Sequence, residues 1–377
     1  MLDLLVSSLT ATAIGLVLGV ILQRRVEKCY AWLRYFVRRH LLGRAHVQRL
    51  PEEFSLGGEI LPFVILDGDG SGFYSKENLT CRLAGTSRSE LPEDIAARRR
   101  LVEAREEAKR AKGCQAAWNG PIHALEYVNV ERTVPREEPK LTLGVSRSDY
   151  FAFQATVASL DEAFPEEQER RTLRQRYIEG SSFKQPITAL AQGFGVCLLV
   201  LGSDEQLALV RRSKRCSVRP DEIDVSVVEG LHPDLDRAST HPGPDPFRTA
   251  TRGAWEELGL VISEDDVRFL GIGVDTEHYQ WNLLGVAVLR QKLVLALDQR
   301  SRGTGGKWEN RDVLCIGSDP GNVFDFLRYE SLWATGWVTL YWGLVSRYGR
   351  RGVDSAARRH LLEQGWRFKR RSEPPLV

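Results

Sequence analysis

The spacing of hydrophobic and polar residues divides the chain after residue 57 into two parts. In the first part, residues 58–66 (GEILPFVIL) are an apolar run of strand length, and short strand-like runs bounded by proline and glycine recur between residues 117 and 150. Residues 89–112 are charged and rich in alanine, which predicts a solvent-facing helix. We therefore expect residues 58–185 to form an α+β region, and its pattern indicates no function.

A second series of elements is expected in residues 186–350. The predicted strands occupy residues 195–202, 207–213, 224–230, 268–274, 282–289 and 312–317. Between the third and fourth of these strands, residues 246–258 predict a helix that ends at Gly259. Strands in this order around one helix are typical of an α+β sandwich.

The end of the chain combines an apolar run with a basic one. Residues 331–346 (SLWATGWVTLYWGLVS) carry no charge, but the run is short for a membrane span. Trp333, Trp337 and Leu340 recur at helical spacing, so we expect a core helix that closes the second part. Residues 351–377 are basic and are predicted to be a tail, either in contact with anionic lipid or solvated.

The N-terminus has the composition of a membrane anchor. No charge interrupts the chain from Leu4 to Leu22, about the length that a helix needs to cross a bilayer. Arginines follow this run, whereas a cleavable signal peptide carries its positive charge in front. We expect residues 1–24 to be a single transmembrane anchor in the cell membrane, with the N-terminus outside and the rest cytoplasmic; a buried helix is the alternative. Residues 25–57 would be a basic and aromatic juxtamembrane segment.

Composition excludes several classes of protein. Lys+Arg number 52 and Asp+Glu 50, so the net charge of +2 argues against a general nucleic-acid-coating protein, and no specific nucleic acid is expected as a partner. The six cysteines lie far apart without a CxxC pair, which argues against a zinc knuckle and against a disulfide framework. Reduced, mostly buried thiols and a reducing compartment are expected.

Residues 67–72 (DGDGSG) allow two interpretations. Asp67, Asp69 and Ser71 alternate as in the first half of an EF-hand loop, where alternate oxygens face one calcium ion. The twelfth position is Asn78 instead of glutamate, and a strand rather than a helix precedes the loop. A glycine- and aspartate-rich turn is the simpler interpretation, and calcium binding stays open.

The predicted helix at residues 246–258 carries the clearest chemistry. It contains the run RGAWEELGL from Arg252 to Leu260. Two adjacent glutamates, Glu256 and Glu257, near the end of a helix can offer carboxylate oxygens to Mg²⁺, which prefers hard oxygen ligands and bridges to substrate phosphates. Arg252 lies one turn before Glu256 on the same face and can orient it.

This run resembles the core of the Nudix box, whose pattern is GxxxxxE, seven residues, then REUxEExGU, where U is aliphatic. Glu229-Gly230, at the end of a predicted strand, is similar to the start of that box. The resemblance implies a Nudix-like α/β/α sandwich with a mixed sheet. It also implies hydrolysis, with Mg²⁺ or Mn²⁺, of a nucleoside diphosphate linked to another moiety.

The resemblance also implies roles for particular residues. Arg252, Glu256 and Glu257 would be catalytic, and the two glutamates would hold the metal. Glu229 and Gly230 would contact the substrate, a nucleotide-like small molecule. Independently of the resemblance, the glycine-rich run at residues 303–307 predicts a flexible loop, and Lys307 in it is a candidate contact for an anionic ligand.

The sequence departs from the Nudix pattern at several positions. Gly253 stands where the family has the glutamate after the arginine, and the segment between Gly230 and Arg252 is about eight residues longer than in the family. Counting back from Arg252, Pro244 occupies the place of the upstream glutamate, with Asp245 beside it. The same long segment holds His232, Asp234, Asp236 and His241, whose spacing does not favour a metal site.

These departures leave two alternatives for the function of the domain. Glu277 or Glu309, on later loops, would have to supply a further metal ligand. Alternatively, the domain is catalytically degenerate and acts at the membrane as a sensor that binds a nucleotide ligand or a protein partner.

Overall fold

A computed structural model describes residues 53–84, 90–114, 116–132, 139–163, 171–216, 219–239, 242–298 and 309–369. The predicted membrane anchor, the juxtamembrane segment up to residue 52, His241 and Lys307 lie outside these residues. Within the described segments, no helix combines the length and the apolar character that a bilayer crossing requires.

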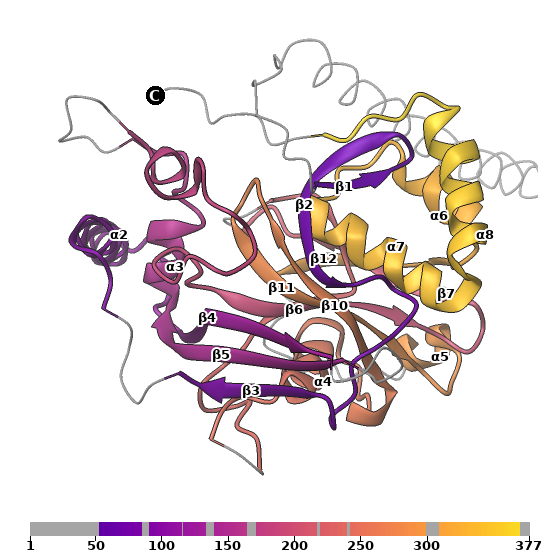
Figure 1. Cartoon of the computed structure of the whole chain (residues 1–377), viewed down its shortest axis with the longest axis horizontal. Coiled ribbons are helices and arrows are strands. Elements are labelled where there is room, and N and C mark those ends of the chain that lie inside the picture. The colour runs from indigo at the N-terminus through magenta and orange to yellow at the C-terminus, as the bar shows by residue number, and fades with distance from the viewer. Residues whose placement is uncertain are drawn as a thin grey trace, which may run out of the picture.

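A mixed β-sheet forms the centre of the described chain (Figure 1). Its strands follow the order β1 (Glu53–Leu56), β2 (Glu59–Gly68), β10 (Val267–Asp275), β11 (Gln280–Val288), β6 (Phe194–Leu201), β7 (Gln206–Arg212) and β12 (Asn310–Gly317). Two short strands complete it: β8 (Ile223–Val225) pairs with β7, and β9 (Val227–Gly230) pairs with β6. Strands β11 and β6 run parallel, and the other neighbours are antiparallel.

Helices cover both faces of this sheet. On one face lies α4 (Pro246–Gly253), which continues as the π-helical turn η2 (Ala254–Leu258). On the other face lie α6 (Pro320–Leu327), α7 (Ala334–Tyr348) and α8 (Arg350–Ala357), followed by η5 (Arg358–Leu362). Every residue of β6 is buried because both of its faces are covered. The arrangement is a three-layer α+β fold with a mixed sheet, and the predicted core helix at residues 331–346 is confirmed by α7.

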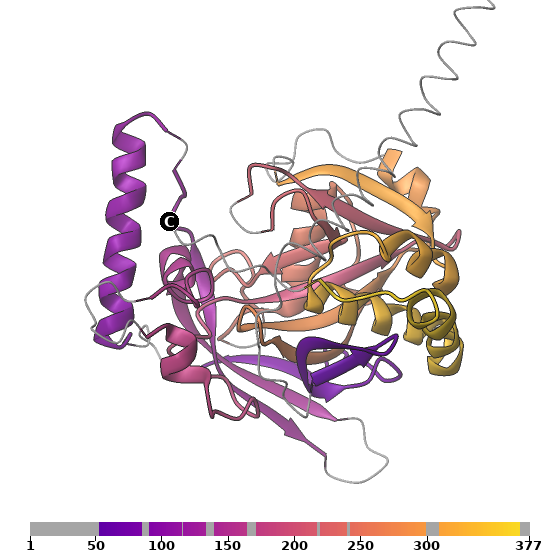
Figure 2. The same ribbon diagram turned by 90° about the horizontal axis from the view of Figure 1, so that it is seen from above.

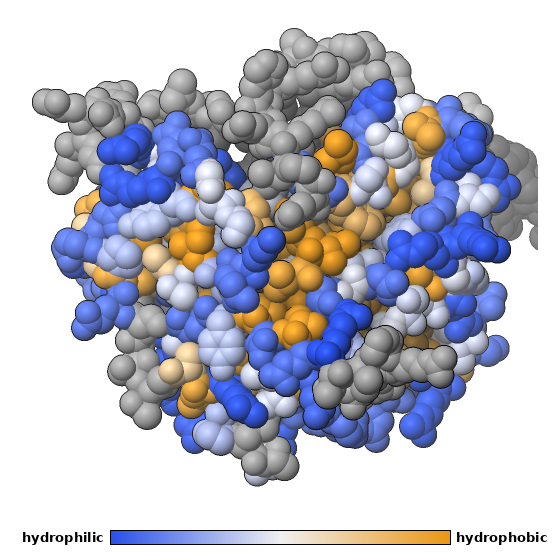
Figure 3. All heavy atoms as spheres, viewed as in Figure 1, coloured by the Kyte–Doolittle hydropathy of each residue, from blue (hydrophilic) through white to orange (hydrophobic). Residues whose placement is uncertain are grey.

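A second, smaller sheet lies beside the first. Strand β5 (Lys140–Asp149) is central, with β3 (Leu79–Leu83) parallel on one side and β4 (Pro121–Glu131) antiparallel on the other. Helices α2 (Glu93–Ala111) and α3 (Tyr150–Thr156) pack together at its outer end, and Figure 2 shows α2 at the periphery of the molecule. The described residues also form the short helical elements η1 (Arg174–Ile178), η3 (Glu264–Asp266) and α5 (Leu293–Asp298). On the face seen in Figure 3, apolar residues gather between this sheet and α7, with hydrophilic residues around them.

Two of the predicted boundaries do not match the packing. Strand β2 pairs with β10, so the large sheet includes residues from both sides of the boundary predicted at residue 186. The predicted basic tail is partly folded: Val353, Leu361 and Trp366 are buried, and the Trp366 and Trp337 ring centroids lie 4.9 Å apart. These apolar residues are interspersed with arginines. Because the local charge is high, the sequence alone did not predict that this segment is folded.

The loop at residues 67–72 forms a turn whose carboxylates already have protein partners. Asp67 contacts the Tyr74 hydroxyl and the Arg132 guanidinium, the latter at 2.7 Å. Asp69 accepts hydrogen bonds from the backbone N–H and the hydroxyl of Ser71, at 2.8 and 2.6 Å. These contacts are those of a self-capped aspartate turn.

Candidate functional site

The helix that carries the box-like run is set by local signals at both ends. The Asp245 side chain accepts a hydrogen bond from the Phe247 N–H at 2.9 Å, and Pro246 occupies the first helical turn, where its missing N–H is harmless. At the other end, Gly259 adopts a left-handed conformation with φ of 71° and ends η2. Asp245 is therefore a helix cap, and this role keeps it out of the acidic site.

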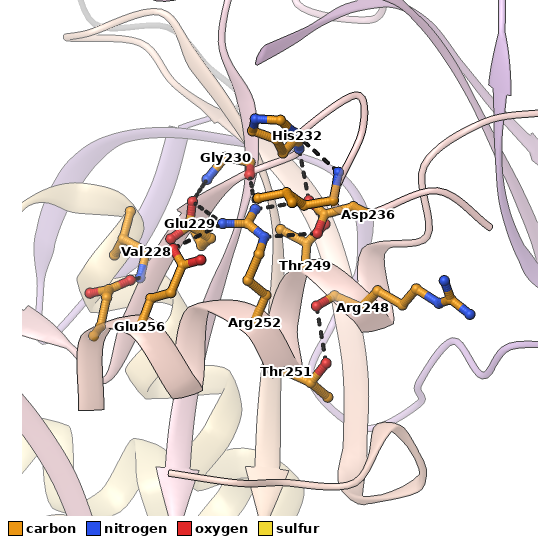
Figure 4. A network of polar contacts seen from close by, with 12 residues as sticks. Val228, Glu229, Gly230, His232, Asp236, Arg248, Thr249, Thr251, Arg252 and Glu256 are labelled. Carbon is orange, nitrogen blue, oxygen red and sulfur yellow. Dashed lines mark hydrogen bonds and ion pairs between the residues drawn. The ribbon is translucent and has the colours of Figure 1, made fainter. Parts of the chain in front are cut away.

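The same helix has one apolar and one polar face. Phe247, Ala250, Ala254 and Leu258 are buried in the core between helix and sheet. Arg252 and Glu256 lie one turn apart on the other side, where their side chains face the end of β9 and the loop that follows it (Figure 4). The packing of the helix therefore fixes where its charged groups lie.

Arg252 is the centre of the polar network (Figure 4). Its Nε and Nη2 donate to the two carboxylate oxygens of Asp236, each at 2.8 Å, and Nη2 also donates to the Gly230 carbonyl at 2.8 Å. Its Nη1 lies 3.1 Å from a Glu229 oxygen and 3.2 Å from a Glu256 oxygen. Burial alone would lower the pKa of Arg252, but Asp236 and the neighbouring glutamates raise it, so the guanidinium stays charged.

Asp236 is fully buried, and the protein satisfies its charge completely. Besides the two bonds from Arg252, it accepts bonds from the His232 N–H at 2.7 Å and the Thr249 hydroxyl at 2.9 Å. The Asp236 carboxylate thus links the loop after β9 to helix α4.

Glu257 faces the sheet instead of solvent. One of its oxygens accepts from the Val228 N–H at 2.9 Å, and the other accepts from the Asn310 amide at 3.2 Å. Burial, followed by the charge of Glu229, raises the pKa of Glu257 well above its usual range. Glu257 therefore connects the helix to β9 and β12.

Two more carboxylates lie in the same region. Burial raises the pKa of Glu229 to about 7; the charge of Glu256 acts in the same direction and that of Arg252 opposes it. Burial also raises the pKa of Glu309, with a further contribution from Glu256. The four glutamates are electrostatically coupled, so bringing a positive charge among them would be favourable.

The structure brings together most of the residues that the sequence singled out. Arg252, Glu256, Glu257, Glu229 and Gly230 share one region, and Lys307 lies outside the described residues. Of the two candidates for a further acidic residue, Glu309 is coupled to this cluster. Glu277 lies in the turn after β10, where its carbonyl accepts a bond from Arg174.

Sequence reasoning missed the role of Asp236. Counting back from Arg252 led to Pro244, because the inserted residues lie between the upstream acid and the arginine. Counting forward from Gly230 reaches Asp236 after five intervening residues, which is the GxxxxxE spacing with aspartate in place of glutamate. The structure places Asp236, rather than Pro244 or Asp245, beside Arg252, which holds it through two hydrogen bonds.

Metal binding requires donors that can turn toward one ion. In the conformation of the described residues, no three His, Cys, Asp or Glu side chains are grouped to hold a metal ion. The donor chemistry of the cluster nevertheless suits Mg²⁺ or Mn²⁺, since it consists of carboxylate oxygens, the ligands that hard cations prefer. The Glu256 side chain is 39% exposed and has room to move.

Comparisons with known proteins give matches only among solved structures; no family model and no curated protein matches this chain. A Deinococcus radiodurans protein is 17% identical over 36% of this chain and 72% of its own, with a TM-score of 0.26. A MutT protein from Methanosarcina mazei is 11% identical over 46% of this chain and 95% of its own (TM-score 0.23). A MutT/nudix family protein from Enterococcus faecalis is 14% identical over 36% and 45%, respectively (TM-score 0.23).

Proposed function

We propose that the chain is a Nudix-like hydrolase that acts, with Mg²⁺ or Mn²⁺, on a nucleoside diphosphate linked to another moiety. One observation carries this proposal: acidic residues from separate segments assemble around Arg252 although the box is interrupted in sequence. Asp236 comes from the loop, Glu229 from β9, and Glu256 from the helix. Carboxylate oxygens are the ligands that a hard cation prefers, and this cluster supplies them from three segments of the chain.

Glu256 and Glu257 are the proposed metal ligands, with Glu309 as a further acidic neighbour. A bound divalent cation would polarise a pyrophosphate group and stabilise the charge that develops on it. Arg252 orients Glu256, and Asp236 in turn fixes Arg252 through two hydrogen bonds. The Val228 N–H and the Asn310 amide hold Glu257 in place. Gly230 and Lys307 are proposed contacts to the substrate.

The proposed location is the cytoplasmic side of the cell membrane. The uncharged run from Leu4 to Leu22 and the arginines after it support an anchor with the N-terminus outside. The described domain would then lie on the cytoplasmic side, where nucleotide derivatives are available as substrates.

A second candidate function is a sensor that binds a nucleotide-like ligand without turnover. The observation that favours it is Glu257, whose two oxygens both accept hydrogen bonds from the protein in a nearly closed environment. A carboxylate engaged in this way stabilises the junction of helix and strands and is less available to a metal. Such a domain, joined to a membrane anchor, would then act as a ligand sensor at the membrane.

The two functions are separated by screening the full-length chain against nucleoside diphosphate derivatives with Mg²⁺ or Mn²⁺, following thermal shift and product release together. The hydrolase predicts product release that falls at least about 100-fold in Glu256→Gln, because an electrostatic contribution to the transition state is lost. A ligand-induced thermal shift without product release would establish the sensor. Glu103→Gln, on the peripheral helix α2, is the matched control and should keep wild-type turnover, because Glu103 also pairs with an arginine at i,i+4 spacing and its side chain is 41% exposed.

A further inference from the structure

The absence of a side chain at Gly253 has a specific packing consequence. A Cβ atom at this position would lie 2.6 Å from Val227 Cγ1, 2.8 Å from Glu229 Cβ and 3.1 Å from Glu229 Cγ. The first two distances are far shorter than a normal carbon–carbon contact of about 3.5 Å or more. The space that a side chain at residue 253 would need is therefore occupied by Val227 and Glu229 from strand β9.

Glu229 is held firmly in that position. Its strand pairs with β6 in a register that sets Val196 opposite Glu229 and Gly195 opposite Gly230. A Cβ at Gly195 would lie 2.5 Å from the Glu229 carbonyl oxygen, so the two strands approach closely there. A one-residue slip would send the carboxylate to the opposite face of the sheet, and this tight pairing opposes such a slip.

The Glu229 carboxylate extends from the strand into the cluster on the helix. One oxygen lies 3.1 Å from Arg252 Nη1, and the same guanidinium nitrogen lies 3.2 Å from Glu256. Arg252 thus links the strand carboxylate to the helix carboxylate. The Glu229 side chain is 22% exposed, which leaves part of it open toward solvent.

We propose that Glu229 supplies, from the strand, the acidic ligand that the helix lacks at Gly253. This inference rests on the proposed function and deepens it. The proposed site then requires glycine at position 253, because a side chain there would overlap with the Glu229 side chain. In this proposal a carboxylate from strand β9 takes the place of the one that the helix lacks.

The test measures Mn²⁺ binding by the full-length chain, by titration calorimetry and by the loss of the free-ion paramagnetic resonance signal. Glu229→Gln keeps the size of the side chain and removes its charge. It should weaken Mn²⁺ binding at least about tenfold, the loss typical when a group that supports a metal site is removed. The matched control is Glu59→Gln, because Glu59 also lies on a strand, pairs with an arginine and has a 22% exposed side chain. It should bind Mn²⁺ as the wild type does.

A relocation experiment tests the role of the space above Gly253. Glu229→Gly combined with Val227→Ala removes the three atoms nearest to a Cβ at residue 253 and should lose the Mn²⁺ affinity. Adding Gly253→Glu to these two changes should restore binding to within about threefold of wild type. Gly253→Glu alone should lose binding and lower the melting temperature, since Val227 and Glu229 still fill the space. Wild-type Mn²⁺ affinity in Glu229→Gln would overturn the inference. So would a triple variant (Val227→Ala, Glu229→Gly, Gly253→Glu) that unfolds cooperatively on heating and binds Mn²⁺ no better than the same chain without Gly253→Glu.

The inference and the proposed function fail in different ways. Mn²⁺ binding that depends on Glu229, without product release from any nucleotide derivative, supports the inference and refutes the hydrolase. Product release that is unchanged in Glu229→Gln refutes the inference and leaves the hydrolase standing. A wild-type chain that binds no Mn²⁺ refutes the inference.

Discussion

At the scale of single residues, the pair of Asp236 and Arg252 has the largest structural consequence. Asp236 is fully buried and accepts four hydrogen bonds, so a substitution that removes its charge leaves Arg252 without its main partner. Asp236→Asn should lower the free energy of unfolding by about 3 kcal/mol, as expected when one member of a buried ion pair is lost. Urea denaturation at neutral pH measures this change.

Asp234, two residues earlier, is a natural control. It is half-exposed and pairs with Arg237 at 2.7 Å at the surface. Asp234→Asn should leave the free energy of unfolding nearly unchanged, because exposed ion pairs contribute little. Equal losses in the two variants would show that the loop as a whole, and not the pair with Arg252, determines the stability.

His123 predicts how stability depends on pH. It is buried on β4 with Nδ1 3.0 Å from the Ser146 carbonyl oxygen, and burial lowers its pKa from 6.5 to about 4. The folded state therefore resists protonation that the unfolded chain accepts. The contribution of His123 is complete above about pH 6.5 and is lost as the pH falls toward 4, by up to about 3 kcal/mol.

Unfolding curves at a series of pH values test this dependence. His123→Asn should flatten the loss of stability between pH 6.5 and 4, whereas the variant and the wild type should run parallel above pH 7. A variant that loses stability as steeply as the wild type would assign the acid sensitivity to other groups.

The residues also show the limits of prediction from sequence. Arg252, Glu256 and Glu257 could be found because they lie within about one and a half turns of one helix, where spacing in sequence fixes spacing in space. The roles of Asp236 and Glu229 depend on a loop of variable length and on strand pairing. The residue spacing around Arg252 therefore predicts neither the role of Asp236 nor that of Glu229. The five-residue interval from Gly230 to Asp236 does point to Asp236.

At the scale of elements, the helix formed by α4 and η2 positions the charged groups by burying its other face. Phe247 is almost fully buried, and its ring centroid lies 5.0 Å from that of Phe269 on the sheet. Phe247→Ala should lower the free energy of unfolding by about 3–5 kcal/mol, because it removes a large core side chain and leaves a cavity. Val261→Ala, at a residue that is 82% exposed just beyond the helix, should cost less than about 0.5 kcal/mol. Comparable losses would contradict the assigned packing.

Most elements near the site follow from local patterns. The predicted strands at residues 195–202 and 207–213 match β6 and β7 within one residue, because buried and alternating runs have clear periodicities. The predicted strand at 224–230 is divided into β8 and β9 at Ser226, whose hydroxyl bonds to the Ala208 carbonyl and accepts from the Val200 N–H. When a side chain takes the place of a backbone partner in the sheet, the pattern of apolar and polar residues does not reveal the break in the strand.

At the scale of the whole molecule, the large sheet joins segments that are distant in sequence. Val64 on β2 pairs with Val274 on β10, and β6 pairs in parallel with β11. Such long-range pairing cannot be deduced from a local pattern, which is why the sequence suggested a boundary near residue 186. The second sheet also reaches the site, since the His123 N–H donates to the Leu231 carbonyl at 3.0 Å.

The proposed anchor predicts where the whole chain is found in a cell. The full-length chain should sediment with membranes and need detergent for release, because the run from Leu4 to Leu22 is uncharged. A chain that begins at residue 25 should lose the anchor and enter the soluble fraction in larger part. Recovery of the full-length chain in the soluble fraction without detergent would refute the anchor.

The central property proposed for this chain is that carboxylates near Arg252 hold a divalent cation. Crystals of the full-length chain grown with Mn²⁺ and measured at an energy where manganese scatters anomalously test this directly. We predict an anomalous peak within about 2.5 Å of carboxylate oxygens of Glu256 and Glu257, the distance expected for a hard cation on oxygen ligands. Crystals in which these oxygens keep their bonds to Arg252, Val228 and Asn310, with no peak beside them, would contradict it.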